Sequence, residues 1–211
     1  MRRRNVKNAD QRIKDASLNV ITEGKEHKGS WSKLFGNNNP IHLEIGMGKG
    51  DFIIEHARTN PNVNYIGLEK FPSVLIQAAD KLNDTHLDNL YLLLVDAATL
   101  DEIFEKQEID KIYLNFSDPW PKARHEKRRL TSPKFLLTYK TFLKGDGEIW
   151  FKTDNKDLYE YSYVTFGENH WNIIENDKNY QLKDEDAMSE YEKKFRALSQ
   201  PIYRIKVKKG D

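Results

Sequence analysis

Short segments of the chain alternate between apolar and polar residues, and longer segments between them repeat their apolar residues every three or four positions. In residues 41–45, for example, Ile41, Leu43 and Ile45 alternate with polar neighbours. A period of two is typical of a strand, and a period near 3.6 indicates a helix. The pattern predicts strands at residues 41–45, 64–69, 90–95, 111–115, 148–153, 171–175 and 202–208.

Predicted helices occupy segments between these strands. In residues 72–83, the apolar positions 74, 75, 78, 79 and 82 share one helical face. The same spacing predicts helices at residues 50–59, 133–142 and 157–168, a short turn at 100–104 and a weakly helical stretch at 9–19. Strands that alternate with helices are typical of a parallel sheet with helices on both faces, so we expect an α/β fold.

One stretch, residues 41–51 with the sequence IHLEIGMGKGD, combines a strand, a glycine turn and the start of a helix. Gly46, Gly48 and Gly50 lack a Cβ, so the chain can turn sharply and a nucleotide-sized ligand can lie against the main chain. However, the spacing GxGxG differs from the dinucleotide pattern GxGxxG, and Lys49 is not followed by the Ser or Thr of a phosphate-binding loop. A nucleotide-like cofactor site and a plain tight turn both remain open.

Carboxylates lie at or just after the ends of four predicted strands: Glu44, Glu69, Asp96 and Asp118. Glu69 follows the glycines by about twenty residues, where an acidic side chain can accept hydrogen bonds from both ribose hydroxyls. Each acidic residue alone is typical of a helix N-cap. Because ligands bind at the carboxyl edge of open parallel sheets, four carboxylates there favour a ligand with hydroxyls, an exocyclic amine and positive charge.

Composition excludes several classes of protein. The 211 residues include 34 Lys plus Arg and 33 Asp plus Glu, so net charge indicates no partner. The absence of cysteine excludes a disulfide framework, a thiolate zinc site and cysteine catalysis. The six histidines show no metal-ligand spacing, so we expect no metal. No apolar run is long enough to span a membrane, and we expect a soluble, cytoplasmic protein.

The length fits one domain, which we expect over residues 31–211, preceded by a basic arm over residues 1–30. Arg2, Arg3, Arg4 and Lys7 give the arm its charge. The arm is either a flexible tail without a partner or a segment that lies on a polyanion. The sequence leaves the oligomeric state open, a homodimer included.

A rigid corner and a basic segment follow the fourth predicted strand. In Asp118-Pro119-Trp120-Pro121 the prolines fix the backbone and hold a carboxylate and an aromatic face beside the glycine turn, where a planar substrate fits. Six cations then occur within residues 122–134, offset only by Glu126. Such a run is usually a solvated surface, but its position beside the corner favours contact with a phosphate backbone. Cations of the last strand would extend this nucleic-acid surface: Arg204, Lys206, Lys208 and Lys209.

Five segments together resemble the bacterial tRNA (guanine-N7-)-methyltransferases, which use S-adenosylmethionine. They read HLEIGMGKGDFI, IGLEKF, FSDPWPKARHEKRRL, FKTDN and SEYEKKF, and the likeness extends from Trp31 to Arg204. The pattern DPWPKxRHxKRRL is far more specific than a glycine turn. The resemblance implies a seven-stranded class I S-adenosylmethionine-dependent methyltransferase sheet, Rossmann-like with helices on both faces, and methylation of a variable-loop guanosine of tRNA at N7.

The resemblance also implies roles for individual residues. Asp118 would be catalytic and would bind the cofactor together with Glu44, Glu69 and Asp96, beside the turn of Gly46, Gly48 and Gly50. The substrate guanosine would contact Lys122, Asp154, Ser189, Glu190, Tyr191 and Glu192. The RNA would contact Arg124, His125, Glu126, Lys127, Arg128 and Arg129. Ser189 departs from the family, which usually has Thr there, but the hydroxyl is kept.

The chemistry of guanine N7 requires no general base, because this nitrogen has a lone pair and no proton. We therefore expect catalysis by alignment and by carboxylates near the charge that develops on the ring. Asp118 would orient the base or stabilise its charge, and Asp154 would accept hydrogen bonds from the amino side of guanine. Three alternatives are a nicotinamide-dependent dehydrogenase, a noncatalytic RNA-binding module and a methyltransferase for protein or small molecules.

Overall fold

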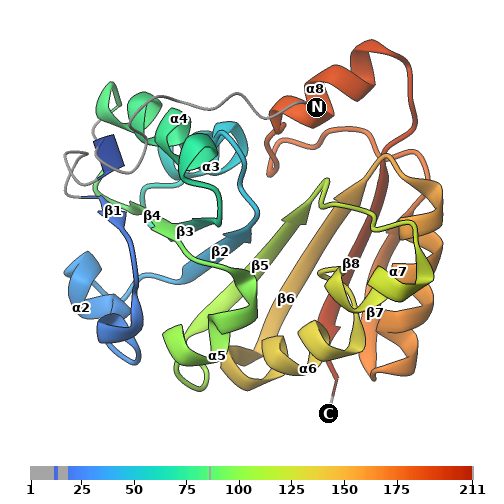
Figure 1. The fold of residues 1–211 in the computed structure, drawn as a ribbon, viewed down its shortest axis with the longest axis horizontal. Helices are drawn as coiled ribbons and strands as arrows, with labels where there is room; N and C mark the ends of the chain where they lie inside the picture. The colour runs from blue at the N-terminus through green and yellow to red at the C-terminus, as the bar shows by residue number, and fades with distance from the viewer. Residues whose placement is uncertain (1–11, 14–18, 86, 211) are drawn as a thin grey trace.

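A central sheet organises the computed structural model, which describes residues 12–13, 19–85 and 87–210 (Figure 1). Within these residues the sheet has eight strands in the order β1-β4-β3-β2-β5-β6-β8-β7. All neighbours are parallel except that β8 runs antiparallel to β6 and β7. The strands are β1 (Val20–Ile21), β2 (Ile41–Ile45), β3 (Asn64–Glu69), β4 (Leu90–Leu94), β5 (Ile109–Asn115), β6 (Leu143–Thr153), β7 (Trp171–Asp177) and β8 (Tyr203–Lys209).

Helices connect the strands, as the apolar spacing predicted. They are α2 (Trp31–Phe35), α3 (Asp51–Thr59), α4 (Pro72–Asn83), α5 (Leu100–Ile103), α6 (Pro133–Phe142), α7 (Lys156–Glu168) and α8 (Glu190–Ala197), with 3-10 helices η1 (Lys25–His27), η2 (Ala97–Thr99) and η3 (Ala123–Arg128). Prolines at the first turn of α4 and α6 fix the backbone angle for a helix start. The predicted helix at residues 9–19 lies largely outside the described residues.

The α/β prediction is confirmed, and the difference in strand number comes from β1. This strand has two residues, Val20 and Ile21, which pair with Leu92 and Leu93 of β4. A two-residue strand is too short to show a period, so its sequence gave no signal. The described residues 19–30, which the sequence assigned to the arm, thus contribute a strand and η1. Arg2, Arg3, Arg4 and Lys7 lie outside the described residues.

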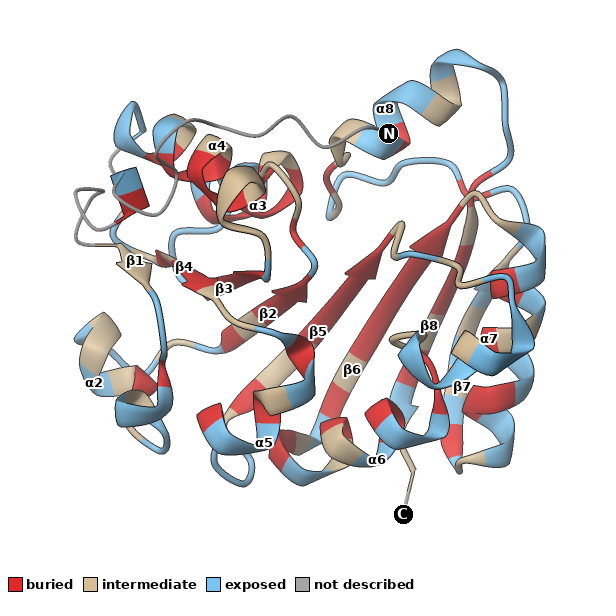
Figure 2. Ribbon diagram, in the orientation of Figure 1, coloured by how far each residue is buried: buried red, intermediate tan, exposed pale blue. Residues whose placement is uncertain are grey.

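Two hydrophobic clusters cover the two faces of the sheet (Figure 2). The first packs α2, α5, α6 and α7 against one face, to which β2 contributes the alternating residues Ile41, Leu43 and Ile45. The second packs α3 and α4 against the opposite face. Strands β3, β4 and β1 extend the sheet on one side of β2, and β5, β6, β8 and β7 extend it on the other side. The chain order therefore reverses between β2 and β5. Such a switch point opens a crevice at the carboxyl ends of the strands.

The last strand of the chain, β8, carries cations that pair with carboxylates. β8 lies between β6 and β7, and the Arg204 side chain has no exposed surface. Arg204 faces Asp186 at 3.4 Å, and Lys206 pairs with Glu175 at 3.1 Å. The assignment of Arg204 to a nucleic-acid surface is therefore wrong, because this cation is buried against a carboxylate. Lys206 is largely covered and is already paired with Glu175.

Buried charges join the sheet to the segment of residues 178–189, which connects β7 to α8. The Asp186 side chain has no exposed surface, and it accepts hydrogen bonds from Lys152 Nζ at 3.1 Å and from the Tyr180 hydroxyl at 3.0 Å. His56 Nε2 lies 3.5 Å from the same carboxylate. Burial alone would raise the pKa of Asp186, but His56, Lys152 and Arg204 together hold it well below its ordinary value.

Lys152 extends this buried group of charges to α8. Its ammonium also donates to Glu192 Oε2 at 2.7 Å, and Arg196 donates to Glu192 Oε1 at 2.7 Å. Lys152 belongs to β6, so one buried cation joins the sheet, the 178–189 segment and α8. Removing one member of this group leaves an uncompensated charge in the protein interior. The resulting loss of folding free energy is far larger than that from losing a surface ion pair.

We predict that Asp186→Ala lowers the free energy of unfolding by about 3–5 kcal/mol at pH 7. Because the folded pKa of Asp186 lies below its unfolded value, this stabilisation is present above pH of about 4 and is lost as the pH falls. Urea denaturation measures the change. The matched control is Asp184→Ala, at an exposed position two residues earlier, which should change stability by less than about 0.5 kcal/mol. Equal midpoints for the two variants would contradict the prediction.

Candidate active site

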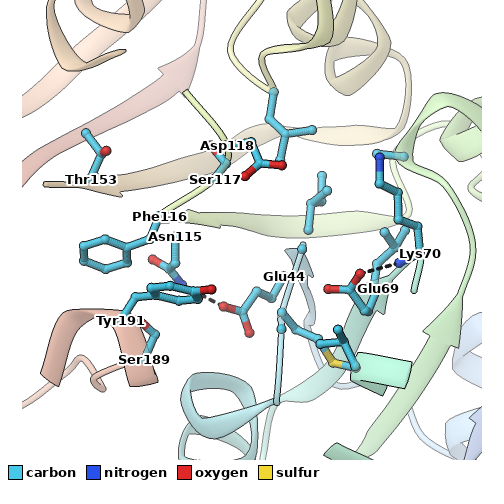
Figure 3. A pocket seen from close by; sticks show the side chains of 18 of the residues that line it. Glu44, Glu69, Lys70, Asn115, Phe116, Ser117, Asp118, Thr153, Ser189 and Tyr191 are labelled. Carbon is cyan, nitrogen blue, oxygen red and sulfur yellow. Dashed lines mark hydrogen bonds between the residues drawn. The ribbon is translucent and has the colours of Figure 1, made fainter. Parts of the chain in front are cut away.

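A cavity of about 1550 Å³ opens at the carboxyl edge of the sheet (Figure 3). Residues at or just after the ends of β2, β3, β4, β5 and β6 line it, together with the first turn of α8. Pockets for a single small ligand usually measure about 300–1,000 Å³. The cavity therefore has room for a nucleotide-sized ligand and a second planar group beside it.

The structure brings together the four carboxylates that the sequence placed at strand ends. Glu44, Glu69, Asp96 and Asp118 all line the cavity. Figure 3 shows Glu44 and Glu69 on neighbouring strands, with Asp118 across the cavity from them. The sequence could place these residues at one edge only because the strands that carry them are parallel.

Glu44 is the most deeply buried of the four, with 1% of its surface exposed. Asn115 Nδ2 donates to Glu44 Oε1 at 2.9 Å, whereas Glu44 Oε2 has no hydrogen-bond partner among the described residues. Burial raises the pKa of Glu44 to about 7, although the hydrogen bond from Asn115 and the charge of Lys152 oppose the rise. An acceptor buried in this way stabilises a cation that enters the cavity.

Glu69 and Asp96 are held by backbone amides. The Glu69 carboxylate accepts hydrogen bonds from the amides of Lys70 at 2.9 Å and Phe71 at 3.0 Å. Burial raises the pKa of Glu69, and these amides oppose the rise. Asp96 is the N-cap of η2 and accepts from Ala98 N at 2.9 Å. Asp96 thus caps a helix and also lines the cavity.

The three glycines of the first turn have two different functions. Gly46 and Gly48 have φ of 78° and 60°, line the cavity, and have nothing within 4 Å of a Cβ built on them. Their bare main chain therefore forms part of the cavity wall. Gly50 is not among the described lining residues, and a Cβ there would lie 2.9 Å from Ala78 Cβ. Gly50 thus allows α3 to begin against α4.

Strained backbone shapes the corner that contains Asp118. Phe116 and Trp120 have φ of 51° and 44°, in the left-handed region that bulky residues rarely adopt. Arg129 donates from Nε to Pro119 O at 3.0 Å and from Nη2 to Trp120 O at 3.1 Å. The surrounding structure must hold such strain in place, and Arg129, which the sequence assigned to RNA, provides two of the bonds that do so.

The basic segment lies beside the cavity. Lys127 and Arg128 line it, and the Arg128 guanidinium lies 4.9 Å from the centre of the Trp120 ring. His125 packs edge-on against the same ring at 5.6 Å. The other predicted contacts are placed as follows: Lys122 and Arg124 are exposed outside the described lining, and Glu126 accepts from the Tyr161 hydroxyl at 3.2 Å.

Helix α8 closes the cavity on the side of β6. Ser189, Glu190 and Tyr191 line it, and Ser189 Oγ caps the helix by accepting from Glu192 N at 3.1 Å. Glu190 Oε1 accepts from Lys49 Nζ at 2.7 Å, which links α8 to the glycine turn. Glu192 points instead into the buried charges below. Asp154, which follows β6, also lines the cavity, and burial raises its pKa.

Sequence reasoning missed an aromatic stack in the wall. The ring of Phe195 lies 5.8 Å from that of Phe116 and 6.3 Å from that of Tyr191, and both pairs are stacked. All three rings line the cavity. The spacing of four residues between Tyr191 and Phe195 could have placed both on one helical face. Asn115 was also not predicted, although its position at the end of the fourth predicted strand was a signal.

No described helix is both long and apolar enough to cross a membrane. Among the same residues, no group of three or more His, Asp or Glu side chains is arranged to hold a metal ion.

Solved structures show what kind of fold surrounds this cavity. The 16S rRNA methyltransferase KamB superposes with a TM-score of 0.66 at 12% identity, over 87% of this chain and 94% of that one. An antibiotic-related methyltransferase superposes with a TM-score of 0.63 at 18% identity, again over 87% and 94% of the two chains. At such low identity the likeness establishes the fold alone, which is that of the class I methyltransferases.

Sequence comparison establishes the family. The family described as "Putative methyltransferase" matches residues 38–205. The tRNA (guanine-N(7)-)-methyltransferase of Geobacillus sp. (strain WCH70) is 50% identical over 99% of this chain and 96% of its own. The protein of the same name from Bacillus licheniformis is 48% identical over 97% of each chain. The chain therefore belongs to the tRNA (guanine-N(7)-)-methyltransferase family, as the sequence motifs predicted.

Proposed function

We propose that this protein methylates N7 of a guanine in tRNA with S-adenosylmethionine as the methyl donor. The observation that carries the proposal is a cavity lined by four carboxylates, with the cations Lys127 and Arg128 in its wall. The acidic side suits a cationic donor, and the basic side suits a polyanion. The sequence motifs further favour a guanosine of the variable loop, and a tRNA substrate favours a cytoplasmic location. The sequence left the oligomeric state open, a homodimer included.

The cavity residues fit the donor by their chemistry. Gly46 and Gly48 present bare main chain where any side chain would occupy the cavity. The Glu69 carboxylate, fixed by two backbone amides, suits paired ribose hydroxyls. Glu44 offers a buried acceptor to a cationic group. When bound, S-adenosylmethionine supplies a methyl group made electrophilic by its sulfonium.

Side chains of this site orient the base and stabilise its charge. Guanine N7 has an in-plane lone pair and no proton, so no residue has to remove a proton before the new bond forms. The purine becomes cationic, and the exposed carboxylate of Asp118 stabilises that charge. Asp154 accepts hydrogen bonds from the N–H groups of guanine, while the stack of Phe116, Phe195 and Tyr191 offers aromatic faces to the flat base.

The basic segment holds the RNA. Some of its residues contact the RNA, and others only support the structure of the site. Arg124, Lys127 and Arg128 contact phosphates, and Lys122 contacts the substrate guanosine. Arg129 instead positions the corner through Pro119 and Trp120. Glu192 likewise supports α8 from below, through Lys152 and Arg196. A noncatalytic RNA-binding module would not need the acidic cavity beside these cations.

The direct test is transfer of a labelled methyl group to bulk tRNA, followed by nucleoside analysis. We expect 7-methylguanosine as the product, and Asp118→Ala should lower turnover on the order of 100-fold. The variant should change donor affinity, measured by calorimetry, by less than about tenfold. Label in another nucleoside, or in no nucleoside, would contradict the function. Lost donor affinity with unchanged turnover at saturating donor would contradict the catalytic role of Asp118.

The RNA surface is tested by the salt dependence of tRNA binding. Arg124→Ala combined with Lys127→Ala should weaken binding and lower the slope of log K against log salt by roughly two, about one for each lost phosphate contact. The matched control combines Lys33→Ala with Lys106→Ala, which removes the same charge from exposed positions that precede β2 and β5 at the opposite edge. An equal slope in both double variants would show that the basic segment is only a solvated surface.

We expect the buried carboxyl group of Glu44 to lower the stability of the protein and, at the same time, to strengthen binding of the donor. Its folded pKa of about 7 lies above the ordinary 4.5, so its favourable contribution is present below pH 4.5 and is lost as the pH rises to about 7. Besides burial, which raises the pKa of Glu44, the hydrogen bond from Asn115 and the charge of Lys152 lower it, whereas the charges of Asp186 and Asp51 raise it further. Glu44→Gln should therefore raise the free energy of unfolding by about 3 kcal/mol at pH 8 and change it little at pH 4.5.

The same Glu44→Gln variant should bind the donor more weakly, although it is more stable. Urea denaturation at the two pH values measures stability, and calorimetry measures donor binding. The control is Glu55→Gln, an exposed residue of α3, which should alter neither quantity. If the variant is no more stable than the wild type at pH 8, burial of the charged Glu44 side chain does not lower the free energy of unfolding.

A further inference from the structure

Two buried oxygen atoms at the base of the cavity lack a hydrogen-bond donor. They are Glu44 Oε2 and Asn115 Oδ1, and among the described residues neither has a partner. The two residues are 1% and 7% exposed. A buried acceptor without a donor has lost its hydrogen bonds to water, and no hydrogen bond within the protein compensates for the free energy of that loss. Because both residues also line the cavity, the missing donor is a group that enters it.

The hydrogen bond between these residues determines which side-chain atom of Asn115 remains without a partner. Asn115 Nδ2 donates to Glu44 Oε1 at 2.9 Å, as Figure 3 shows. With Glu44 ionised, as it is when a cation is bound, turning the amide over would place two acceptor oxygens against each other, so the orientation follows from the chemistry. Asn115 therefore clamps one oxygen of Glu44 and keeps its own oxygen free.

The positions of the two residues single out one end of the ligand. Glu44 is the penultimate residue of β2, and Asn115 is the last residue of the neighbouring β5. Glu69 ends β3 and Asp96 follows β4, on the other side of the glycine turn. If Glu69 takes the ribose, the β2–β5 end of the cavity faces the amino-acid part of the donor. An ammonium group has three N–H donors and a positive charge, which suits one carboxylate oxygen and one amide oxygen side by side.

We infer that Asn115 is a further donor-binding residue, whose Oδ1 accepts a hydrogen bond from the ammonium group of the amino-acid end while Glu44 Oε2 accepts another. This inference rests on the proposed use of S-adenosylmethionine. An amide suits the position better than a second carboxylate, because two adjacent buried negative charges would repel each other. The ammonium is the same in S-adenosylmethionine and S-adenosylhomocysteine, so Asn115 stabilises donor and product complexes equally.

The test measures the affinity contributed by that ammonium group. Calorimetry gives the Kd of S-adenosylhomocysteine and of its desamino analogue, in which hydrogen replaces the ammonium. In the wild type we expect the analogue to bind about 100-fold more weakly. In Asn115→Leu this ratio should fall by about tenfold, while the Kd of the analogue changes less than threefold. The KM for S-adenosylmethionine should rise in Asn115→Leu, because binding energy that is uniform between ground and transition state contributes to KM.

Asn64→Leu is the matched control. Asn64 is also a fully buried asparagine whose Oδ1 lacks a partner among the described residues, but it begins β3 and is not a cavity residue. Its variant should keep the wild-type affinity ratio. Asn115→Ala, which adds no bulk, serves as a second variant if the leucine prevents folding.

Each outcome separates this inference from the proposed function. Equal losses for both ligands in the Asn115 variants, or no loss, would overturn the inference while the wild type still methylates tRNA. If the wild type binds neither ligand and transfers no methyl group, the proposed function itself fails. A tenfold smaller ratio in both Asn115 variants with an unchanged ratio in Asn64→Leu supports the inference.

Discussion

The arrangement of the site depends on a buried lysine that is shared by two carboxylates. Lys152 is 2% exposed, and its ammonium binds Asp186 at 3.1 Å and Glu192 at 2.7 Å. Lys152 and its two partners belong to three different parts of the chain, which are β6, the segment after β7, and α8. A charge in a dry interior tolerates few positions of its partners. Through this constraint the sheet fixes where α8 presents Ser189 and Tyr191 to the cavity.

Around this anchor, the cavity combines an acidic interior with a basic rim. Carboxylates gathered at one edge repel one another, and the structure offsets that cost locally. Backbone amides hold Glu69 and Asp96, and Asn115 holds Glu44. The carboxylates that remain negative favour a cationic ligand, while Lys127 and Arg128 favour phosphates. Opposite charges side by side therefore allow one cavity to receive a cationic donor and the polyanion that accepts its methyl group.

Several motif residues support the site without contacting its cavity. Gly50 allows α3 to pack against α4, and Arg129 holds the carbonyl groups of a strained corner. Glu192 is fully buried beneath α8. These residues lie within sequence motifs that also contain ligand-contacting candidates, so a motif by itself does not separate the two roles. The distinction comes from the direction of each side chain.

The sequence by itself determined the alternating strands and helices, the bounds 72–83 and 133–142 of two helices, and the four acidic strand ends. These features depend on local spacing, on prolines at helix starts and on the parallel direction of neighbouring strands. Only the tertiary structure decided that Arg204 is buried, that β8 lies between β6 and β7, and that Asn115 leaves an oxygen unpaired. The residues that determine these features are far apart in the sequence. A local pattern of residues cannot predict which distant side chain will neutralise a charge.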